Sequence, residues 1–369
     1  MSYSARIAPH FMRALRQNGT IASRRPLLFN ATTTVRPFSV SAKFMRGPPK
    51  APAQEADNLR TGNEAPTFLG TQKRLPEFNL VDRVVLVSGG ARGLGLAQSE
   101  ALLEAGAKVY ALDRLEKPSP EFYNVQAKAQ KELGTSLHYH QIDVRDEAGL
   151  NKTIEKIGKE NGRLDGLIAA AGIQQETTAF DYNAADFNRM LEVNVTGVFL
   201  TAQAAAKQMV KFGNGGSIVM IASMSGTIAN KGLACPAYNT SKSAVLQLAR
   251  NLAAEWGTHG IRVNTISPGY ILTAMVEDLF VKFPERRAEW STQNMLGRLS
   301  QPKEYRGAAV FLLSDASTFM TGADLIMDGG HHSCFLGSLL RGSSSQCKCS
   351  MHGKSISYSL CLEIAFFEV

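Results

Sequence analysis

Two residues in the second half of this chain of 369 residues combine types and spacing that could move a proton. Tyr238 and Lys242 stand four residues apart in a stretch typical of a helix, where this spacing puts both side chains on one face. An ammonium near a phenol favours the phenolate, so the pKa of Tyr238, about 10 in water, could fall toward physiological pH and serve proton transfer. A solvated surface pair has the same spacing and remains the alternative.

A glycine-rich turn at residues 88–95 is the second pattern with chemical use. Residues without Cβ let the backbone approach a phosphate, and the helix that follows offers free N–H groups and a partial positive charge. The spacing is G-x-x-x-G-x-G rather than G-x-G-x-x-G, so a plain tight turn is the alternative. The residues expected to hold a pyrophosphate here are Gly89, Arg92, Gly93, Leu94 and Gly95.

A carboxylate at the end of the next apolar run helps to predict whether the chain binds NAD or NADP. Asp113 has the spacing from the glycine turn at which a carboxylate accepts hydrogen bonds from the adenosine ribose and repels a 2′-phosphate. We therefore expect NAD, with NADP second because Arg92 and Arg114 could pair with a phosphate. Asp143 and Val144 are candidates for the adenine edge, and the alternative for Asp143 is an N-cap of the following helix.

The elements that must position these residues alternate along the chain. Short apolar or β-branched runs, which predict strands, alternate with segments of ten residues or more that predict helical crossovers. The fold class expected is α/β, a doubly wound parallel seven-stranded sheet of the Rossmann type in a single domain over residues 78–330. The seven predicted strands are 83–88, 107–112, 137–142, 164–170, 217–221, 262–266 and 324–327.

Taken together, these motifs resemble the short-chain dehydrogenase/reductase family over residues 78–330. The matches stand in the family's order, and they are the glycine turn, Asp113, Asp143, Ala171-Gly172, Asn194, Ser223, Tyr238 with Lys242, Ser267-Pro268-Gly269 and Asp328-Gly329-Gly330. The resemblance implies that Tyr238 exchanges a proton with the substrate oxygen and that Lys242 binds the nicotinamide ribose. It further implies that Ser223 holds the reacting carbonyl or hydroxyl. Asn194 would hold a water leading from Lys242 to solvent, and the alternative is a buried structural amide.

The resemblance also implies further cofactor contacts, and the chain departs from the family pattern twice. The implied contacts are Ala171, Gly172, Asn194, Tyr238, Lys242, Pro268, Gly269, Ile271 and Thr273. The family's Asn-Asn-Ala-Gly is replaced by alanines at 169–171 before Gly172, which removes side-chain hydrogen bonds that steady the fourth strand. Ser225, rather than Ser223, has the common spacing to Tyr238. We prefer Ser223 because it directly follows the predicted strand.

The substrate expected is a polyol or another secondary alcohol, oxidised to a ketone or formed from it. Gln174, Gln175 and Glu176 follow the fourth strand with polar groups suited to hydroxyls, and residues 270–298 are expected to form a lid. The stretches around Gly172 and Ser223 resemble fungal polyol dehydrogenases and ketose reductases of the mannitol, arabinitol and sorbose type. Alternatives are a ketoreductase of specialised metabolism and a non-catalytic NAD-binding scaffold protein. The family resemblance implies a homotetramer or dimer.

Charge and composition at the two ends describe segments outside this domain. Residues 1–50 carry nine bases and no acid, are typical of a mitochondrial transit peptide and predict the matrix, or the cytoplasm if the leader does not function. Residues 51–77 are typical of a linker, and 331–369 of an irregular Cys- and Ser-rich tail whose cysteines lack zinc-site spacing, so no metal is expected. Without the leader the chain has 31 bases against 32 acids, which argues against nucleic acid, and no apolar run is long enough to span a membrane.

Overall fold

Residues 75–333 are described by the computed structural model of this chain. The expected transit peptide 1–50, nearly all of the expected linker and the tail from residue 334 lie outside the described residues. The ordered elements extend slightly past the expected domain limits at both ends. A 3-10 turn at Pro76–Phe78 precedes the first strand, and another at His331–Ser333 follows the last strand.

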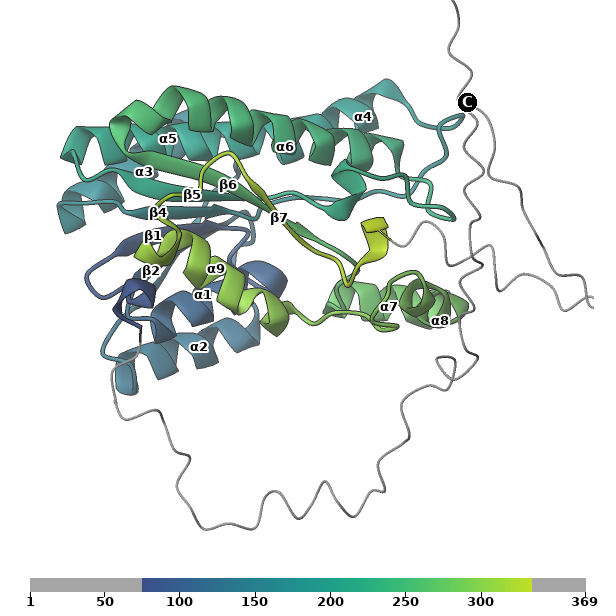
Figure 1. Ribbon diagram of the computed structural model, residues 1–369, viewed down its shortest axis with the longest axis horizontal. Coiled ribbons are helices and arrows are strands. Elements are labelled where there is room, and N and C mark those ends of the chain that lie inside the picture. Colours follow the sequence, from purple (N-terminus) through teal and green to yellow (C-terminus); the bar gives the residue numbers. More distant parts are fainter. Residues whose placement is uncertain (1–74, 334–369) are drawn as a thin grey trace, which may run out of the picture. The chain divides into compact units, whose positions relative to one another are not determined.

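A single parallel sheet of seven strands forms the centre of the described part, in the order β3-β2-β1-β4-β5-β6-β7 (Figure 1). Every neighbouring pair is parallel, and the order reverses direction between β1 and β4, which makes the sheet doubly wound. The expected fold class is therefore confirmed. The strands are β1 Val84–Ser88, β2 Lys108–Asp113, β3 Leu137–Gln141, β4 Gly166–Ala169, β5 Gly216–Ile221, β6 Ile261–Pro268 and β7 Asp324–Met327.

Helices cover both faces of this sheet because each strand-to-strand crossover passes through one (Figure 1). One face carries α3 (Glu147–Asn161), α5 (Gly197–Phe212) and α6 (Pro236–Trp256). The opposite face carries α1 (Gly93–Glu104), α2 (Pro120–Lys131) and α9 (Arg306–Leu313). Two further helices, α7 (Ala274–Lys282) and α8 (Glu285–Thr292), lie beyond the end of β6, and α4 (Ala184–Leu191) precedes a π-helical turn at Glu192–Thr196.

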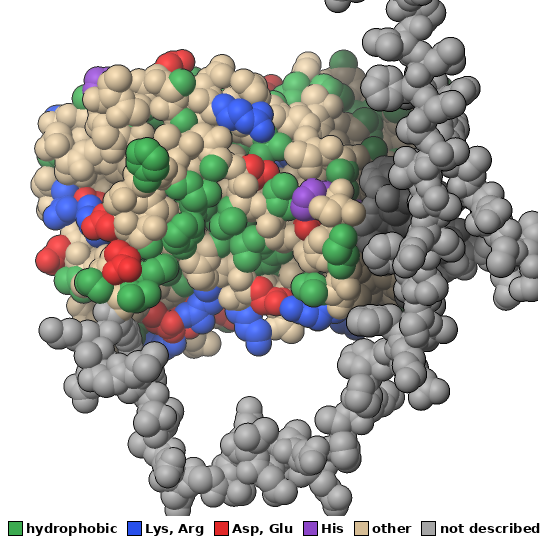
Figure 2. All heavy atoms as spheres, in the orientation of Figure 1, with side chains coloured by type: hydrophobic (Ala, Val, Ile, Leu, Met, Phe, Trp, Pro, Cys, Tyr) green, Lys and Arg blue, Asp and Glu red, His purple; other side chains and the backbone are tan. Residues whose placement is uncertain are grey.

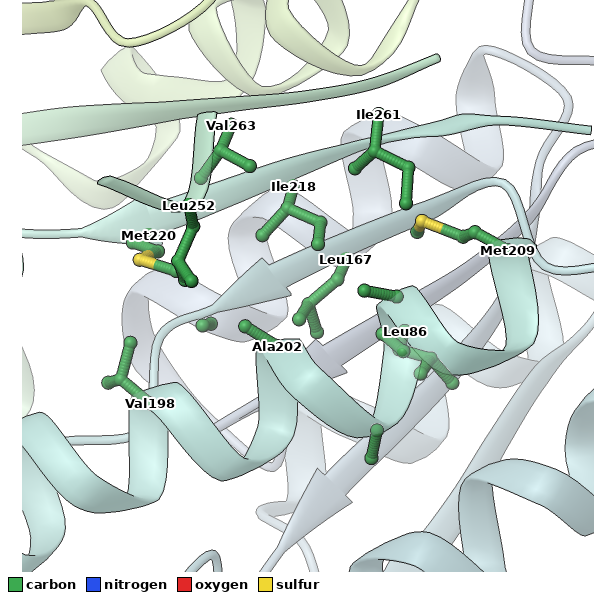
Figure 3. Close-up of a cluster of buried hydrophobic side chains, with 14 of the residues drawn as sticks. Leu86, Leu167, Val198, Ala202, Met209, Ile218, Met220, Leu252, Ile261 and Val263 are labelled. Atoms are coloured by element: carbon green, nitrogen blue, oxygen red, sulfur yellow. The ribbon is translucent and has the colours of Figure 1, made fainter. Parts of the chain in front are cut away.

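Strands buried on both faces explain why the sequence shows continuous apolar runs here rather than an alternating pattern. Leu86, Leu167 and Ile218 point from adjacent strands toward α5 and α6, where Ala202 and Met209 pack against them (Figure 3). A second cluster on the other face joins Val85 and Val87 of β1 to α1, α2 and α9. The central strands thus hold the strand ends, where the motifs lie, in fixed positions.

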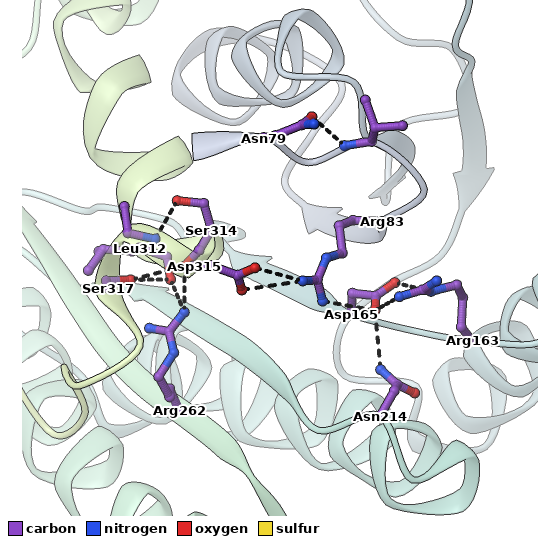
Figure 4. A network of polar contacts seen from close by, with 12 residues as sticks. Asn79, Arg83, Arg163, Asp165, Asn214, Arg262, Leu312, Ser314, Asp315 and Ser317 are labelled. Atoms are coloured by element: carbon purple, nitrogen blue, oxygen red, sulfur yellow. Dashed lines mark hydrogen bonds and ion pairs between the residues drawn. The ribbon is translucent and has the colours of Figure 1, made fainter. Parts of the chain in front are cut away.

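A polar network around the buried carboxylate of Asp165 holds the amino ends of β1 and β4 (Figure 4). Asp165 is 5% exposed and accepts hydrogen bonds from the Val84 backbone at 2.9 Å and from Arg163 at 2.7 and 2.8 Å. Arg83 lies 3.6 Å from the same carboxylate and also pairs with Asp315 at 3.2 Å. This network lies at the amino ends of β1 and β4, opposite the edge that carries the motifs. Within residues 75–333, no helix has the length and apolar character needed to cross a membrane.

Candidate active site

The glycine turn after β1 packs tightly against the segment that follows β4. Gly89 has φ 66°, a left-handed conformation that favours glycine, and a Cβ there would lie 2.8 Å from the Ala171 backbone nitrogen. A Cβ on Gly95 would overlap the Gly89 carbonyl oxygen. The turn then enters α1 at Gly93, with Leu94 in the first turn and Arg92 as the exposed N-cap residue. The arrangement leaves bare backbone at a helix N-terminus, which fits a pyrophosphate.

Asp113, the last residue of β2, is attached to this turn through its carboxylate. One oxygen accepts a hydrogen bond from the Ala91 backbone at 3.2 Å and the other from the Leu115 backbone at 3.2 Å. The negative charge therefore lies beside the turn where a dinucleotide ribose would follow the pyrophosphate. Arg92 and Arg114 are both exposed, and neither pairs with Asp113 in the described residues.

The carboxylate of Asp143, which is expected at the adenine edge, is hydrogen-bonded to Arg145. Arg145 donates to both of its oxygens, at 2.7 Å for the closest contact, and this hydrogen bonding holds the pKa of Asp143 below its usual range. The alternative N-cap role for Asp143 is wrong, because Asp146 caps α3 by accepting from the Gly149 backbone at 2.9 Å. Val144, the second residue expected at the adenine edge, is 7% exposed.

Tyr238, Lys242 and Ser223 meet where α6 passes the end of β5. Lys242 Nζ lies 5.6 Å from the centre of the Tyr238 ring and donates to the Ile221 carbonyl at 2.8 Å. The Ser223 hydroxyl accepts from the Ser225 backbone at 3.2 Å, and it lies close enough to the Tyr238 phenol to act against the rise in the pKa of that phenol. The structure thus places Ser223, and not the alternative Ser225, against the phenol.

Burial shifts the pKa values of this pair in opposite directions. It raises the pKa of Tyr238 to about 12, against which the hydrogen bond from Ser223 acts, and it lowers the pKa of Lys242 to about 8. Burial, and not the charge of Lys242, is the largest influence on the tyrosine pKa in this structure. The Lys242 ammonium faces the Ile221 carbonyl and passes over the ring rather than meeting the hydroxyl, so the loss of hydration dominates for both groups.

Asn194 is fully buried in the π-helical turn, and its amide makes structural contacts. Its oxygen accepts from the Ile173 backbone at 2.8 Å, and its nitrogen donates to the Ile173 carbonyl at 2.9 Å and to Ser241 Oγ at 3.0 Å. The side chain therefore ties the segment after β4 to α6, one residue before Lys242. These are the contacts of the structural amide that the sequence left as the alternative to a water ligand.

The segment after β4 needs this support because alanines replace the family's amides. Ser88 Oγ accepts from the Ala171 backbone at 3.3 Å, which supplies a further attachment. A Cβ on Gly172 would lie 3.3 Å from Asn194 Oδ1 and 3.7 Å from Lys242 Nζ. Ala171 and Gly172 thus lie between the glycine turn and the Tyr238–Lys242 pair, as a residue next to a nicotinamide would.

The remaining expected cofactor residues lie at the end of β6 and the start of the lid. Pro268 ends β6, and the Gly269 backbone donates to the Met327 carbonyl at 3.0 Å. Ile271 forms an isolated bridge with Ser300, which closes the base of the segment 270–298. Thr273 caps α7 by accepting from the Val276 backbone at 3.4 Å, so its O–H remains able to donate to a ligand.

Other contacts around the site could not be foreseen from local spacing. Tyr270 stacks on Trp290 with ring centres 4.3 Å apart, and Asn230 donates to the Tyr270 hydroxyl at 3.4 Å. Glu176 and Arg286 form an ion pair at 2.7 Å between the segment after β4 and α8. The partners stand 110 residues apart, so the polar run 174–176 was the only sequence signal for this pair.

Comparison with known proteins gives the chain its family. The family described as Enoyl-(Acyl carrier protein) reductase matches residues 89–332. A protein of Aspergillus versicolor named short chain dehydrogenases/reductase notP' is 41% identical over 69% of this chain and 88% of its own length. The chain belongs to the short-chain dehydrogenase/reductase family.

Two other relatives of this short-chain dehydrogenase/reductase have names that state an activity. The ribulose-forming D-arabinitol 2-dehydrogenase of Candida tropicalis is 34% identical over 70% of this chain and 95% of its own. A gluconate 5-dehydrogenase from Burkholderia cenocepacia, solved with NADP and tartrate, is 32% identical with a TM-score of 0.63 and covers 70% of this chain and 98% of its own. The family membership makes this chain an oxidoreductase that links an alcohol and a ketone to a nicotinamide cofactor.

The residues present fit such a cofactor. The glycine turn has its close packing because Gly89 and Gly95 lack a Cβ, which at either position would collide with backbone, and Asp113 stands beside the turn. Gly172 brings bare backbone to within reach of Lys242 Nζ at the other end of the path. The two ends of an extended dinucleotide would thus meet the turn after β1 and the Tyr238–Lys242 pair.

Proposed function

We propose that this chain is an NAD-linked dehydrogenase that interconverts a polyol and a ketose. The observation that carries the proposal is that Ser223, Tyr238 and Lys242 meet where α6 passes the end of β5, with Lys242 Nζ 5.6 Å from the centre of the Tyr238 ring. These groups can hold and protonate one substrate oxygen. The named activity of the Candida relative and the polar run after β4 support a hydroxylated substrate.

The proposed mechanism assigns one task to each side chain. The nicotinamide supplies or accepts the hydride at the substrate carbon. Because its pKa is about 12, Tyr238 is a neutral acid over the physiological range and donates its proton to the substrate oxygen in ketone reduction. Ser223 donates a second hydrogen bond to the developing oxyanion. In alcohol oxidation Tyr238 reacts as the phenolate, after releasing its own proton to solvent, and its Oη accepts the proton of the alcohol, while Lys242 would hold the nicotinamide ribose.

The residues proposed to hold the cofactor lie along one path across the carboxyl edge of the sheet. Gly89, Gly93 and Gly95 with Arg92 and Leu94 would hold the pyrophosphate, and Asp143 with Val144 the adenine. Ala171, Gly172, Pro268 and Gly269 would flank the nicotinamide, with Ile271 and Thr273 covering it and Asn194 supporting the path. The choice of NAD over NADP rests on Asp113, whose carboxylate stands beside the turn.

The test is a substrate panel. The full chain is incubated with pentitols, hexitols and the matching ketoses, each with NAD(H) and with NADP(H), and nicotinamide absorbance is followed. A Tyr238→Phe variant should keep nucleotide binding and lose turnover by at least about a hundredfold, since the general acid is removed. A wild type that turns over no member of the panel would contradict the polyol proposal.

A second candidate function is favoured by the aromatic side chains of the lid. Tyr270 stacks on Trp290, and Phe280 meets Trp290 edge-on with ring centres 5.5 Å apart, so this segment is an aromatic one that suits a bulky apolar ketone. A ketoreductase of specialised metabolism would therefore reduce apolar ketones and leave ketoses untouched. The third alternative, a non-catalytic NAD-binding scaffold, predicts nucleotide binding without turnover of any substrate.

We also propose that the enzyme is a homotetramer or dimer. Figure 2 shows hydrophobic side chains gathered across the face on which β7 and α9 lie. β7 is a half-buried edge strand, and Phe319 just before it is fully exposed. An exposed apolar surface of this kind is typical of a site that contacts another protein chain. Light scattering should give at least the dimer mass, and a monomer mass at micromolar concentration would contradict the proposal.

The proposed location is the mitochondrial matrix, supported by the nine bases and no acids of residues 1–50. The cytoplasm is the alternative. A fluorescent protein fused after residue 50 should colocalise with a matrix marker, and a fusion with the arginines at 6, 13 and 16 replaced by glutamine should not. Diffuse fluorescence of the unaltered fusion would favour the cytoplasm.

A further inference from the structure

An ion pair stands where the segment after β4 meets the lid. The carboxylate of Glu176 accepts from the two terminal nitrogens of Arg286, at 2.7 and 2.9 Å. Two parallel bonds of this kind are the geometry in which a guanidinium recognises a carboxylate most specifically. Arg286 thus already holds the ligand that its shape fits best.

Backbone and ring contacts keep both partners beside the candidate site. The Thr177 backbone donates to the Ala234 carbonyl at 2.8 Å, which attaches the segment of Glu176 to the loop just before Tyr238. On the lid, the guanidinium of Arg286 lies 4.5 Å from the centre of the Phe283 ring, and its side chain is only 17% exposed. A cation this shielded from water needs its partner.

The charges of the pair also reach groups next to the reacting phenol. Burial, followed by the charge of Glu176, raises the pKa of Cys235 to about 11, and Cys235 stands three residues before Tyr238. Burial raises the pKa of Tyr270, and the charge of Arg286 acts against this rise. The pair therefore lies between the loop before α6 and the first residue of the lid.

Two other cations near the site, Lys242 and Arg189, are engaged elsewhere. Lys242 faces the Ile221 carbonyl, and Arg189 donates to Gln175 at 2.8 Å and pairs with Asp186 at 3.3 Å. Arg286 is a cation placed to meet an anionic group on a substrate, and Glu176 accepts from both of its terminal nitrogens. A hydroxyl can donate to Glu176 without breaking the pair, whereas a carboxylate must displace it against like-charge repulsion.

We propose that Glu176, by occupying Arg286, makes this site select neutral hydroxylated substrates and reject sugar acids. The proposal rests on the polyol function above and narrows its substrate class. Removing the charge of Glu176 should expose a ready-made carboxylate site. Both residues act on substrate choice, and neither takes part in the transfer of the hydride or the proton.

The experiment compares two ketones that differ in one group. L-sorbose carries a terminal CH2OH where 5-keto-D-gluconate carries a carboxylate, and reduction of each by the full chain is followed by nicotinamide absorbance. The wild type should prefer the ketose by at least about tenfold in kcat/KM. Glu176→Gln should raise kcat/KM for the keto acid by at least about tenfold, mainly through KM, because the donors of Arg286 become free.

Two further variants separate charge selection from anchoring of the lid. Adding Arg286→Gln to Glu176→Gln should abolish the gain with the keto acid. Glu304→Gln is the matched control, because Glu304 makes the same two-bonded pair with Arg298, at 2.6 and 2.8 Å, and should leave the ratio of the two substrates unchanged. If Glu176→Gln changes kcat/KM for both ketones by the same factor, the pair only anchors the lid and the proposal is overturned.

A binding measurement keeps this result separate from the polyol proposal. Calorimetry with NAD present measures the binding of D-glucitol and of D-gluconate, which differ in the same terminal group as the two ketones. If the wild type reduces neither ketone, the polyol function fails, and a gain in D-gluconate binding by Glu176→Gln of at least about tenfold still supports charge selection. If Glu176→Gln raises neither the turnover nor the binding of the acid, the charge-selection proposal is overturned.

Discussion

Tyr238 and Lys242 lie in surroundings that penalise the charged form of both side chains. The pKa of Tyr238 rises to about 12 and that of Lys242 falls to about 8 through burial. A proton is therefore held on the phenol and released easily from the amine. This division suits ketone reduction, in which the phenol must remain an acid while the substrate oxygen gains charge.

These shifts predict how stability depends on pH. Between about pH 8 and 10.5 the unfolded state binds the proton of Lys242 and the folded state does not, so the free energy of unfolding should rise with pH, by up to roughly 3 kcal/mol. From pH 10 to 12 the protonated Tyr238 of the folded state acts in the opposite direction, and stability is lost as pH rises. Urea unfolding of nucleotide-free protein at several pH values measures both effects.

Single variants isolate the two groups. Lys242→Met should remove the rise between pH 8 and 10.5, and Tyr238→Phe should reduce the loss above pH 10. Each variant is compared with the wild type at the same pH, so that changes at other titrating groups cancel. Identical pH profiles for Lys242→Met and the wild type would show that burial does not shift the lysine pKa.

Asp113 predicts the response of cofactor preference to a single substitution. Asp113→Ser should lower the NAD/NADP ratio of kcat/KM by at least about tenfold, because it removes both the ribose acceptor and the repulsion of a 2′-phosphate. Asp113→Asn should shift the ratio in the same direction through loss of charge alone. A wild type that already prefers NADP would show that Arg92 and Arg114 outweigh the carboxylate.

At the scale of elements, the segment after β4 depends on a side chain from the π-helical turn. Asn194→Ala should lower the free energy of unfolding by about 2 to 4 kcal/mol, because the half-buried N–H and C=O of Ile173 lose their partner. Urea unfolding measures the loss. Asn251→Ala is the control, since Asn251 is an exposed amide on α6 that bonds only Gln247, and it should leave the unfolding midpoint nearly unchanged. Equal small effects would contradict a structural amide.

The sequence predicted all seven strands within about two residues because buried parallel strands are continuous apolar runs. It also predicted which residues gather at the carboxyl edge, since strand ends in such a sheet share one edge. It did not predict the pKa of Tyr238, which depends on how deeply α6 packs and where Lys242 Nζ turns. The Glu176–Arg286 pair was beyond prediction because its partners meet only in the folded chain.

At the scale of the whole molecule, the two edges of the sheet have different tasks. The carboxyl edge carries the candidate site, and the amino edge carries the network around Asp165 that joins β1, β4 and the loop before β5. Substitutions at the amino edge should therefore affect stability with little effect on kcat. This separation is what the fold predicts, because ligands of doubly wound sheets bind at the carboxyl ends of the strands.

Asp165→Ala tests that separation. The variant should lose about 2 kcal/mol of stability, because the buried Val84 N–H loses its acceptor and Arg163 its partner, an effect moderated by the partial exposure of Arg163. Asp315→Ala, which removes an exposed partner of Arg83, should leave the urea midpoint nearly unchanged. A large loss of kcat in folded Asp165→Ala would contradict the assignment.

The stack of Trp290 on Tyr270 gives the lid an optical signal of its own. The chain has two tryptophans, and the other, Trp256, ends α6 near the start of β6. A Trp256→Phe protein would therefore emit from α8 alone, where Trp290 is 6% exposed between Tyr270 and Phe280. Ligands that displace α8 should change the wavelength and intensity of Trp290 emission. Manual mixing would show the size of this change, and stopped-flow mixing would show its rate. The rate of lid movement could then be set beside the rate of hydride transfer in the same sample, which would show whether chemistry or opening limits turnover.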